Sequence, residues 1–136
     1  IGDLAAMPQQ LQSNLATATD NTAANSGLNL QVALNYGSRL ELTEAVKTIA
    51  QSVKDGKLPL EEITPELISS HLYTKDLPDP DLIIRTGGDM RLSNYLLWQA
   101  AYTEIYVTNV MWPEFDETEF DKAVEEFSNR QRRYGS

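Results

Sequence analysis

The residues best suited to chemistry lie between Pro80 and Tyr106. Arg85, Arg91 and Ser93 fall within nine residues of one another and bracket the pair Gly87-Gly88. Two guanidiniums, a hydroxyl and a loop whose glycines allow close backbone approach are typical of a receptor for phosphate or diphosphate. Glu104 follows in an apolar segment, and a carboxylate is a natural hard ligand for the divalent cation that a diphosphate site usually needs.

Each of these residues also has an ordinary structural explanation. Arg85 could pair with Asp81 or Asp89, and the two glycines could form a common turn. Ser93 would cap a helix whether or not a ligand binds beside it. Short motifs often occur without function, so the residues alone leave both interpretations open.

The elements around this stretch predict an α/β fold. Leu82–Ile84 is an apolar run typical of a strand buried on both faces, and Ser93 stands where a helix N-cap would be, just before the apolar Tyr95–Trp98. Further helices are expected over 9–24, 40–54, from 64 to about 72 and from 116 to about 132, and further strands over 28–34 and 105–107. Such alternation predicts a mainly parallel sheet with helices on both faces.

The ends of the predicted strands carry the polar residues. Asp3, Asn35-Tyr36-Gly37 and Arg85 each follow a predicted strand. In open α/β sheets ligands gather outside the carboxyl ends of the strands. We therefore expect these three strand ends to face one cleft.

Composition narrows the classes of function. The 136 residues include no cysteine and one histidine, so disulfides and thiolate chemistry are excluded and a metal site would use oxygen ligands or the lone His71. The net charge of −9 argues against non-specific nucleic-acid binding. No apolar run approaches the ~20 residues of a membrane span. A cytoplasmic protein is expected.

Three motifs, in order, resemble the cis-prenyltransferase family, of the undecaprenyl diphosphate synthase (isoprenyl transferase) type. They are Asn35-Tyr36-Gly37-Ser38-Arg39, the stretch 79–106 followed by Trp112-Pro113-Glu114-Phe115, and the terminal Arg132-Arg133-Tyr134-Gly135. The resemblance covers the whole chain but only the C-terminal half of the family's pattern. It implies a partial domain, with 1–136 as the C-terminal half of a single domain. The family's catalytic aspartate belongs to the half that precedes Ile1.

The resemblance also implies roles for particular residues. Arg85, Arg91 and Ser93 match the positions that hold the isopentenyl diphosphate head group, and Glu104 matches the acid associated with Mg²⁺. Asn35, Gly87, Gly88 and Arg133 are secondary candidates, and no catalytic residue is assigned within these residues. Asp89 and Ser38 depart from the family's usual glutamate and glycine, so close backbone approach at Ser38 is less secure.

The implied reaction condenses isopentenyl diphosphate with an allylic diphosphate such as farnesyl diphosphate to give a cis-polyprenyl diphosphate. We expect Mg²⁺ dependence, a homodimer, contact with a membrane surface through the lipid product, and no activity from residues 1–136 alone. Two alternatives are a non-catalytic partner subunit of a heteromeric prenyltransferase and a phosphate-binding module. The second has neither a Walker-type loop nor a Gly-x-Gly-x-x-Gly motif to support it.

The position of Glu104 raises a question of distance. If the segment from Ser93 to Glu104 were one helix, its rise would be about 16–17 Å, too long for both side chains to hold one diphosphate. Either the chain doubles back, or Glu104 serves the site of a neighbouring subunit, or it only pairs with an arginine at an interface. The apolar Tyr102, Ile105 and Tyr106 around it favour the neighbouring subunit of a homodimer.

Overall fold

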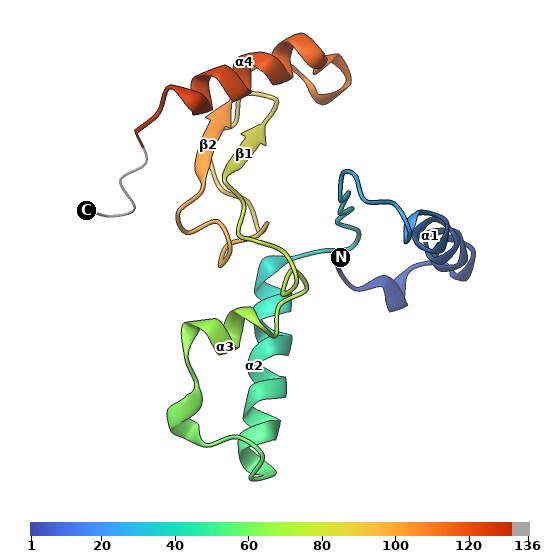
Figure 1. The fold of residues 1–136 in the computed structure, drawn as a ribbon, viewed down its shortest axis with the longest axis vertical. Coiled ribbons are helices and arrows are strands. Elements are labelled where there is room, and N and C mark those ends of the chain that lie inside the picture. The colour runs from blue at the N-terminus through green and yellow to red at the C-terminus, as the bar shows by residue number, and fades with distance from the viewer. Residues whose placement is uncertain (132–136) are drawn as a thin grey trace. The chain divides into compact units, whose positions relative to one another are not determined.

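The chain divides into two compact units, residues 1–76 and 77–136. The computed structural model describes residues 1–131, and Figure 1 shows the helices and strands in chain order. Unit 1 contains the helices α1, α2 and α3, whereas unit 2 contains the strands β1 and β2 and the helix α4.

Unit 1 is built from helices that the sequence predicted. They are α1 (Gln9–Thr22), α2 (Ser38–Lys54) and α3 (Pro65–Ser69). Ala45 and Ile49 on α2 are buried at helical spacing, and α2 contacts α3. Thr64 caps α3 because its Oγ1 accepts a hydrogen bond from the Leu67 N–H at 3.2 Å.

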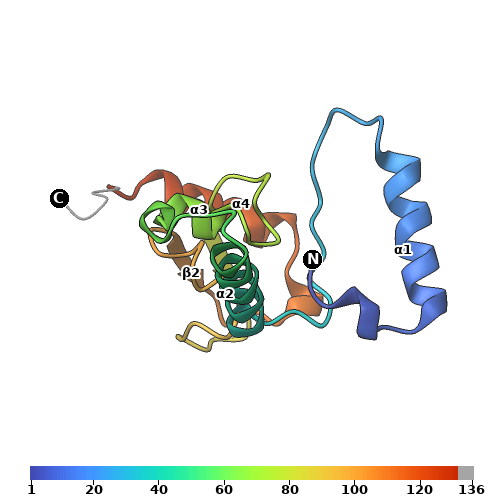
Figure 2. The same cartoon turned by 90° about the horizontal axis from the view of Figure 1, so that it is seen from below.

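The segment 28–34, predicted as an inner strand, is extended but does not join a sheet among the residues that the structure describes. Figure 2 shows it returning in the direction opposite to α1. The Ile1 amine donates to the Val32 carbonyl at 2.8 Å, and the Leu34 N–H donates to the Ile1 carbonyl at 3.0 Å. Leu28 and Leu30 are 93% and 76% exposed. The prediction is wrong for this chain because an inner strand needs partners on both edges and cover on its faces.

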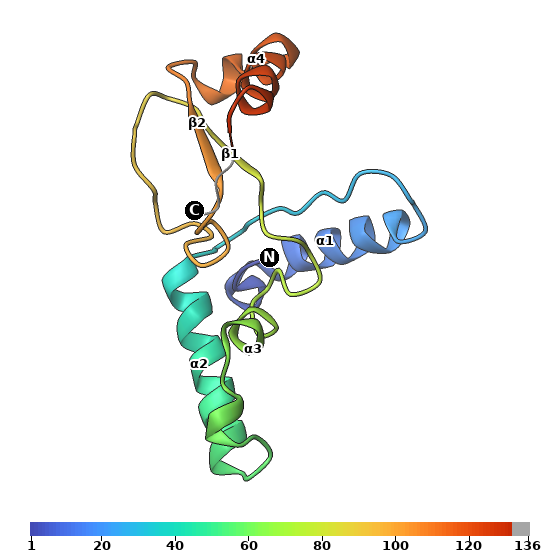
Figure 3. The ribbon, with the colours of Figure 1, turned by 60° about the vertical axis from the view of Figure 1, so that its left-hand side comes forward.

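Unit 2 centres on two parallel strands, β1 (Leu82–Arg85) and β2 (Glu104–Val107). Leu82 pairs with Glu104, and Arg85 pairs with Val107. Helix α4 (Glu117–Ser128) packs on β2, as Figure 3 shows. The α/β class and the parallel pairing are therefore confirmed, although α4 ends at Ser128 rather than near 132.

The helix predicted to begin after Ser93 does not form. The chain passes from 91 to 103 through bends and turns, and Leu96 has a φ of +46° in the left-handed region. A leucine with that backbone conformation interrupts a right-handed helix. The chain therefore returns to the sheet by turns. Within residues 1–131 no helix combines the length and apolar character that crossing a membrane requires.

Candidate functional site

The loop that leaves β1 turns sharply at two glycines. Gly87 and Gly88 have φ values of +83° and +78°, which a residue with a side chain rarely adopts. A Cβ added to Gly88 would also lie 2.6 Å from Oδ1 of Asn109. The sharp turn predicted for these glycines is thus present, and its backbone geometry favours glycine at both positions.

The backbone N–H groups of this loop donate hydrogen bonds to carbonyls of the same chain. The Gly87 N–H donates to the Val110 carbonyl at 2.9 Å, and the Gly88 N–H donates to the Thr108 carbonyl at 2.8 Å. Both donors are therefore already satisfied. We conclude that the glycines shape the loop, and that anion recognition there would fall to side chains.

Two guanidiniums meet one carboxylate on this loop, in what we term the Asp89 cluster (Arg85, Asp89 and Arg91). Oδ2 of Asp89 lies 3.4 Å from Nη2 of Arg85 and 2.5 Å from Nη2 of Arg91. Two positive groups and one negative group leave a formal charge of +1. The pairing of Arg85 with Asp89, one of the structural alternatives, is present, yet it leaves the cluster an attractive place for an anion.

Arg85 is the more enclosed of the two arginines. Its side chain is 24% exposed, against 67% for Arg91. Its Nε is buried and has no acceptor among the residues that the structure describes. A buried guanidinium N–H without an acceptor is costly, so this atom marks a place where an acceptor oxygen would bind favourably.

Ser93 is exposed and follows Arg91 in the irregular part of the chain. Since no helix begins after it, the predicted N-cap role is wrong. Its hydroxyl makes no hydrogen bond to residues 1–131, so its assignment to the diphosphate head group stays a prediction.

Glu104 begins β2 and joins a second charged group, the Arg130 cluster (Glu104, Glu126 and Arg130). Nη1 of Arg130 donates to Oε2 of Glu104 at 2.9 Å and to the Ile105 carbonyl at 3.0 Å. Its Nη2 donates to Oε1 of Glu126 at 2.5 Å. Hydrogen bonds to Glu126 and Glu104 raise the pKa of Arg130. Glu104 therefore pairs with an arginine of its own chain, whereas the third option, a pair at an interface, stays a prediction.

The fit of Glu104 to Mg²⁺ can be tested on its two oxygens. Oε2 is bound to Arg130, while Oε1 has no partner in the described part of the chain. No group of three or more His, Cys, Asp or Glu residues gathers there as a metal site. Mg²⁺ is often held by one or two carboxylates together with substrate phosphates. Glu104 therefore fits the role of one protein ligand, with the other ligands supplied from elsewhere.

Arg85 and Glu104 lie at opposite ends of the strand pair. Arg85 is the last residue of β1, whereas Glu104 is the first residue of β2 and pairs with Leu82. Three residues of strand separate the two levels by about 10 Å. The two residues thus do not converge on one small anion within this chain, although the segment between them is turned rather than helical.

Asn35 and Asp3 meet in unit 1. The Asp3 N–H donates to the Asn35 carbonyl, and Nδ2 of Asn35 donates to the Asp3 carbonyl, both at 3.3 Å. Asn35 has a φ of +47°, which asparagine tolerates better than most residues. Two of the three predicted strand ends are therefore together, and their convergence with Arg85 stays a prediction.

A buried acid beside this motif was not anticipated from the sequence. Glu41 on α2 is 1% exposed and accepts hydrogen bonds from the Tyr36 hydroxyl at 2.6 Å and the Tyr73 N–H at 2.7 Å. The Tyr73 hydroxyl donates to Glu44, and this bond is the main reason that the pKa of Tyr73 rises to about 12. The local sequence does not indicate this burial, because the partner Tyr73 is 32 residues away from Glu41.

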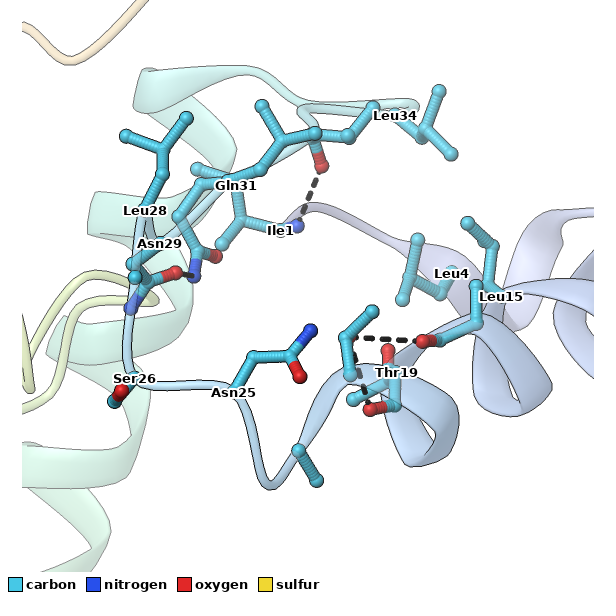
Figure 4. Close-up of a pocket in the computed structure, with 16 residues that line it drawn as sticks. Ile1, Leu4, Leu15, Thr19, Asn25, Ser26, Leu28, Asn29, Gln31 and Leu34 are labelled. Carbon is cyan, nitrogen blue, oxygen red and sulfur yellow. Dashed lines mark hydrogen bonds between the residues drawn. The ribbon is translucent and has the colours of Figure 1, made fainter.

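An open groove of about 840 Å³ lies between α1 and the extended segment 25–34. Figure 4 shows Leu4 and Leu15 on one side of this groove and Leu28 and Leu34 on the other. Its lining includes no charged side chain. This groove suits a hydrocarbon better than a diphosphate.

Arg133 and the motif Arg132-Arg133-Tyr134-Gly135 lie outside the described residues. Arg130, just before that motif, is a residue that sequence reasoning missed. Its spacing of four from Glu126 indicated one half of its pairing. Nothing in the local sequence indicated Glu104, which is 26 residues away.

A parallel strand pair whose loop gathers guanidiniums defines an α/β protein with a candidate diphosphate site. A family model described as "Putative undecaprenyl diphosphate synthase" matches residues 1–135. The chain belongs to this family, and the resemblance seen in the sequence is confirmed.

Relatives and solved structures agree with this assignment. Isoprenyl transferases of Porphyromonas gingivalis and Chlamydia muridarum are 46% and 51% identical over 135 residues, which are 99% of this chain and 53% of each relative. The lavandulyl diphosphate synthase of Lavandula x intermedia, solved with dimethylallyl diphosphate, is 36% identical with a TM-score of 0.97, covering 100% of this chain and 58% of that one. A probable undecaprenyl diphosphate synthase of Campylobacter jejuni is 32% identical with a TM-score of 0.82, covering 100% and 61%.

The chain spans about half the length of the curated relatives that it matches, since it covers 53% of each. The prediction of a partial domain agrees with this coverage.

Proposed function

We propose that the whole protein is a cis-prenyltransferase that condenses isopentenyl diphosphate with an allylic diphosphate of the farnesyl type, with undecaprenyl diphosphate as the product. The Asp89 cluster carries the proposal, because it concentrates positive charge after a parallel strand in a chain whose net charge is −9. The names of the relatives support a transferase and do not favour a non-catalytic partner subunit or a simple phosphate-binding module.

In this proposal the two arginines bind the diphosphate head group of isopentenyl diphosphate. Arg85 and Arg91 each present a planar fork of donors that suits phosphate oxygens, and the orphaned Nε of Arg85 gains an acceptor. The ion pairs of Asp89 with the two arginines weaken when the more highly charged diphosphate binds. Ser93, whose hydroxyl is exposed, adds a further donor, and the glycine turn keeps Arg85 and Asp89 in register.

Mg²⁺ is the proposed cofactor, with Glu104 Oε1 as one ligand. Bound Mg²⁺ would offset the negative charge that develops as the allylic diphosphate leaves. Glu104 supplies a hard oxygen that Arg130 holds in place. The remaining ligands come from substrate phosphates and from outside residues 1–131.

The proposal is tested with the full-length protein, labelled isopentenyl diphosphate and farnesyl diphosphate. We expect Mg²⁺-dependent incorporation of label into butanol-extractable polyprenyl product, and loss of that incorporation with EDTA. Residues 1–136 alone should be inactive. Absence of product from the full-length protein, with ATP rather than isopentenyl diphosphate raising its melting temperature, would favour the phosphate-binding alternative instead.

A homodimer is the second part of the proposal, and the placement of Glu104 supports it. Because Glu104 and Arg85 lie at opposite ends of the strand pair, we propose that Glu104 serves the site of a neighbouring subunit. Mixing Glu104→Ala subunits with Arg91→Ala subunits should restore activity, since one site of the mixed dimer then carries both lesions and the other carries none. No recovery in a verified mixed dimer would contradict this arrangement. The cytoplasmic location, contact with a membrane surface and the single-domain assignment stay predictions.

A further inference from the structure

We propose that Arg130 and Glu126 form a positioning pair for Glu104, holding one oxygen of its carboxylate so that the other faces a divalent cation. This inference rests on the proposed function, because it assumes that Glu104 is a ligand. It concerns two residues whose local sequence indicated no role in the site.

Geometry provides the first part of the argument. Nη1 of Arg130 bridges Oε2 of Glu104 and the Ile105 carbonyl, at 2.9 and 3.0 Å. The guanidinium therefore ties the carboxylate to the backbone of its own strand, which restricts the side-chain rotamers of Glu104. Oε1 of Glu104 has no partner in the part of the chain that the structure describes. One oxygen is fixed and the other is available.

Burial strengthens the bond between Arg130 and Glu104. The side chains of Glu104 and Arg130 are 28% and 30% exposed. Such partly enclosed pairs are less screened by salt than pairs on the open surface. By contrast, Lys122 pairs with Glu119 on the same helix with its own side chain 57% exposed. That second pair provides a matched control for an ordinary ion pair of α4.

Charge provides the second part of the argument. A guanidinium beside Glu104 would cancel the negative charge that attracts a cation. Glu126 removes this conflict, because its carboxylate lies 2.5 Å from Nη2 of Arg130. Two carboxylates and one guanidinium leave a formal charge of −1. The cluster thus keeps Glu104 fixed and still attractive to a cation.

Residues that hold a metal ligand typically change metal affinity by about 10- to 100-fold when they are removed. We therefore expect Arg130→Gln in the full-length protein to weaken Mn²⁺ binding by that factor. The probe is Mn²⁺ in the presence of inorganic diphosphate, titrated by electron paramagnetic resonance without turnover. Glu126→Gln, at an exposed position, should weaken Mn²⁺ binding several-fold while leaving the melting temperature nearly unchanged. Lys122→Gln should leave Mn²⁺ binding at the level of the unmodified protein.

The outcomes separate this inference from the proposed function. If Glu104→Gln loses Mn²⁺ binding but Arg130→Gln and Glu126→Gln keep the unmodified affinity, the positioning role is wrong and the proposed ligand stands. If Glu104→Gln itself binds Mn²⁺ normally, the ligand assignment fails and the inference fails with it. Arg130→Lys distinguishes a structural role, because lysine keeps the charge but lacks the planar fork whose two nitrogens reach the three acceptors. Full Mn²⁺ affinity in that variant would overturn the argument from geometry.

Discussion

The two charged clusters of unit 2 are built from the same groups in inverse proportion. In the Asp89 cluster one carboxylate lies between two guanidiniums, whereas in the Arg130 cluster one guanidinium lies between two carboxylates. The first has a formal charge of +1 and suits an anion, and the second has a formal charge of −1 and suits a cation. In each cluster the central group orients the outer two and leaves one unit of charge unbalanced.

The clusters also differ in how the chain builds them. The Asp89 cluster comes from one loop, residues 85–91, while the Arg130 cluster joins the start of β2 to the end of α4. A loop cluster can change shape with its ligand, and a cluster that ties two elements together is held by both. We therefore expect substitutions in the Asp89 cluster to change mainly substrate binding. Substitutions in the Arg130 cluster should change mainly cation binding.

Among the substitutions that test this comparison, Arg85→Lys in the full-length protein should change substrate binding most. Lysine has no counterpart of the buried Nε, so charge-assisted bonding of about 1.5–3 kcal/mol is at risk. That corresponds to a rise of about 10- to 150-fold in the KM for isopentenyl diphosphate, with the KM for the allylic substrate little changed.

Arg91→Lys is the internal control for this measurement. Arg91 is 67% exposed, so the same substitution there should raise that KM less than Arg85→Lys does. Equal rises in the KM values of both substrates in the Arg85 variant would contradict a head-group role and indicate a folding defect.

Asp89→Asn should strengthen anion binding, and by less than Arg85→Lys weakens it. The substitution raises the formal charge of the cluster from +1 to +2, so inorganic diphosphate should bind about 1.4- to fivefold more tightly at low salt, in keeping with the 0.2–1 kcal/mol of exposed ion pairs. Calorimetric titration at two salt concentrations measures this. Weaker binding in Asp89→Asn would show that orientation of the guanidiniums by Asp89 outweighs its charge.

The smallest effect should come from Tyr73→Phe, outside both clusters. The pKa of Tyr73 is raised from 10.0 to about 12, chiefly because its neutral hydroxyl donates to Glu44. The hydrogen bond therefore stabilises the fold below pH 10 and is lost as the pH rises toward 12. Because the pair is largely exposed, the stability difference should be less than about 1 kcal/mol.

Urea unfolding of the unmodified protein and of Tyr73→Phe at pH 8 and pH 11 measures this dependence. The difference between the two proteins should be smaller at pH 11, and their KM values should agree at pH 8. A difference in stability that is the same at both pH values would contradict the assignment of the raised pKa to the Glu44 bond.

Local patterns were sufficient for much of the fold. The helices α1, α2 and α3 were predicted close to their observed bounds because apolar spacing and caps such as Thr64 act within a few residues. Two predictions from local patterns were wrong. Tyr95–Trp98 has an apolar helical pattern, but Leu96 adopts a left-handed backbone and the segment turns. Segment 28–34 alternates like a strand but has no ladder among the described residues.

The amino-acid sequence by itself determined which residues form the Asp89 cluster. Arg85, Asp89 and Arg91 lie within seven residues, and Gly87 and Gly88 between them permit the turn that brings their side chains together. Only the tertiary structure decided the surroundings of Glu104 and Glu41. Arg130 is 26 residues from Glu104, and Tyr73 is 32 residues from Glu41. Contacts over such separations depend on how helices and strands pack, because no short-range spacing in the chain brings these groups within hydrogen-bonding distance.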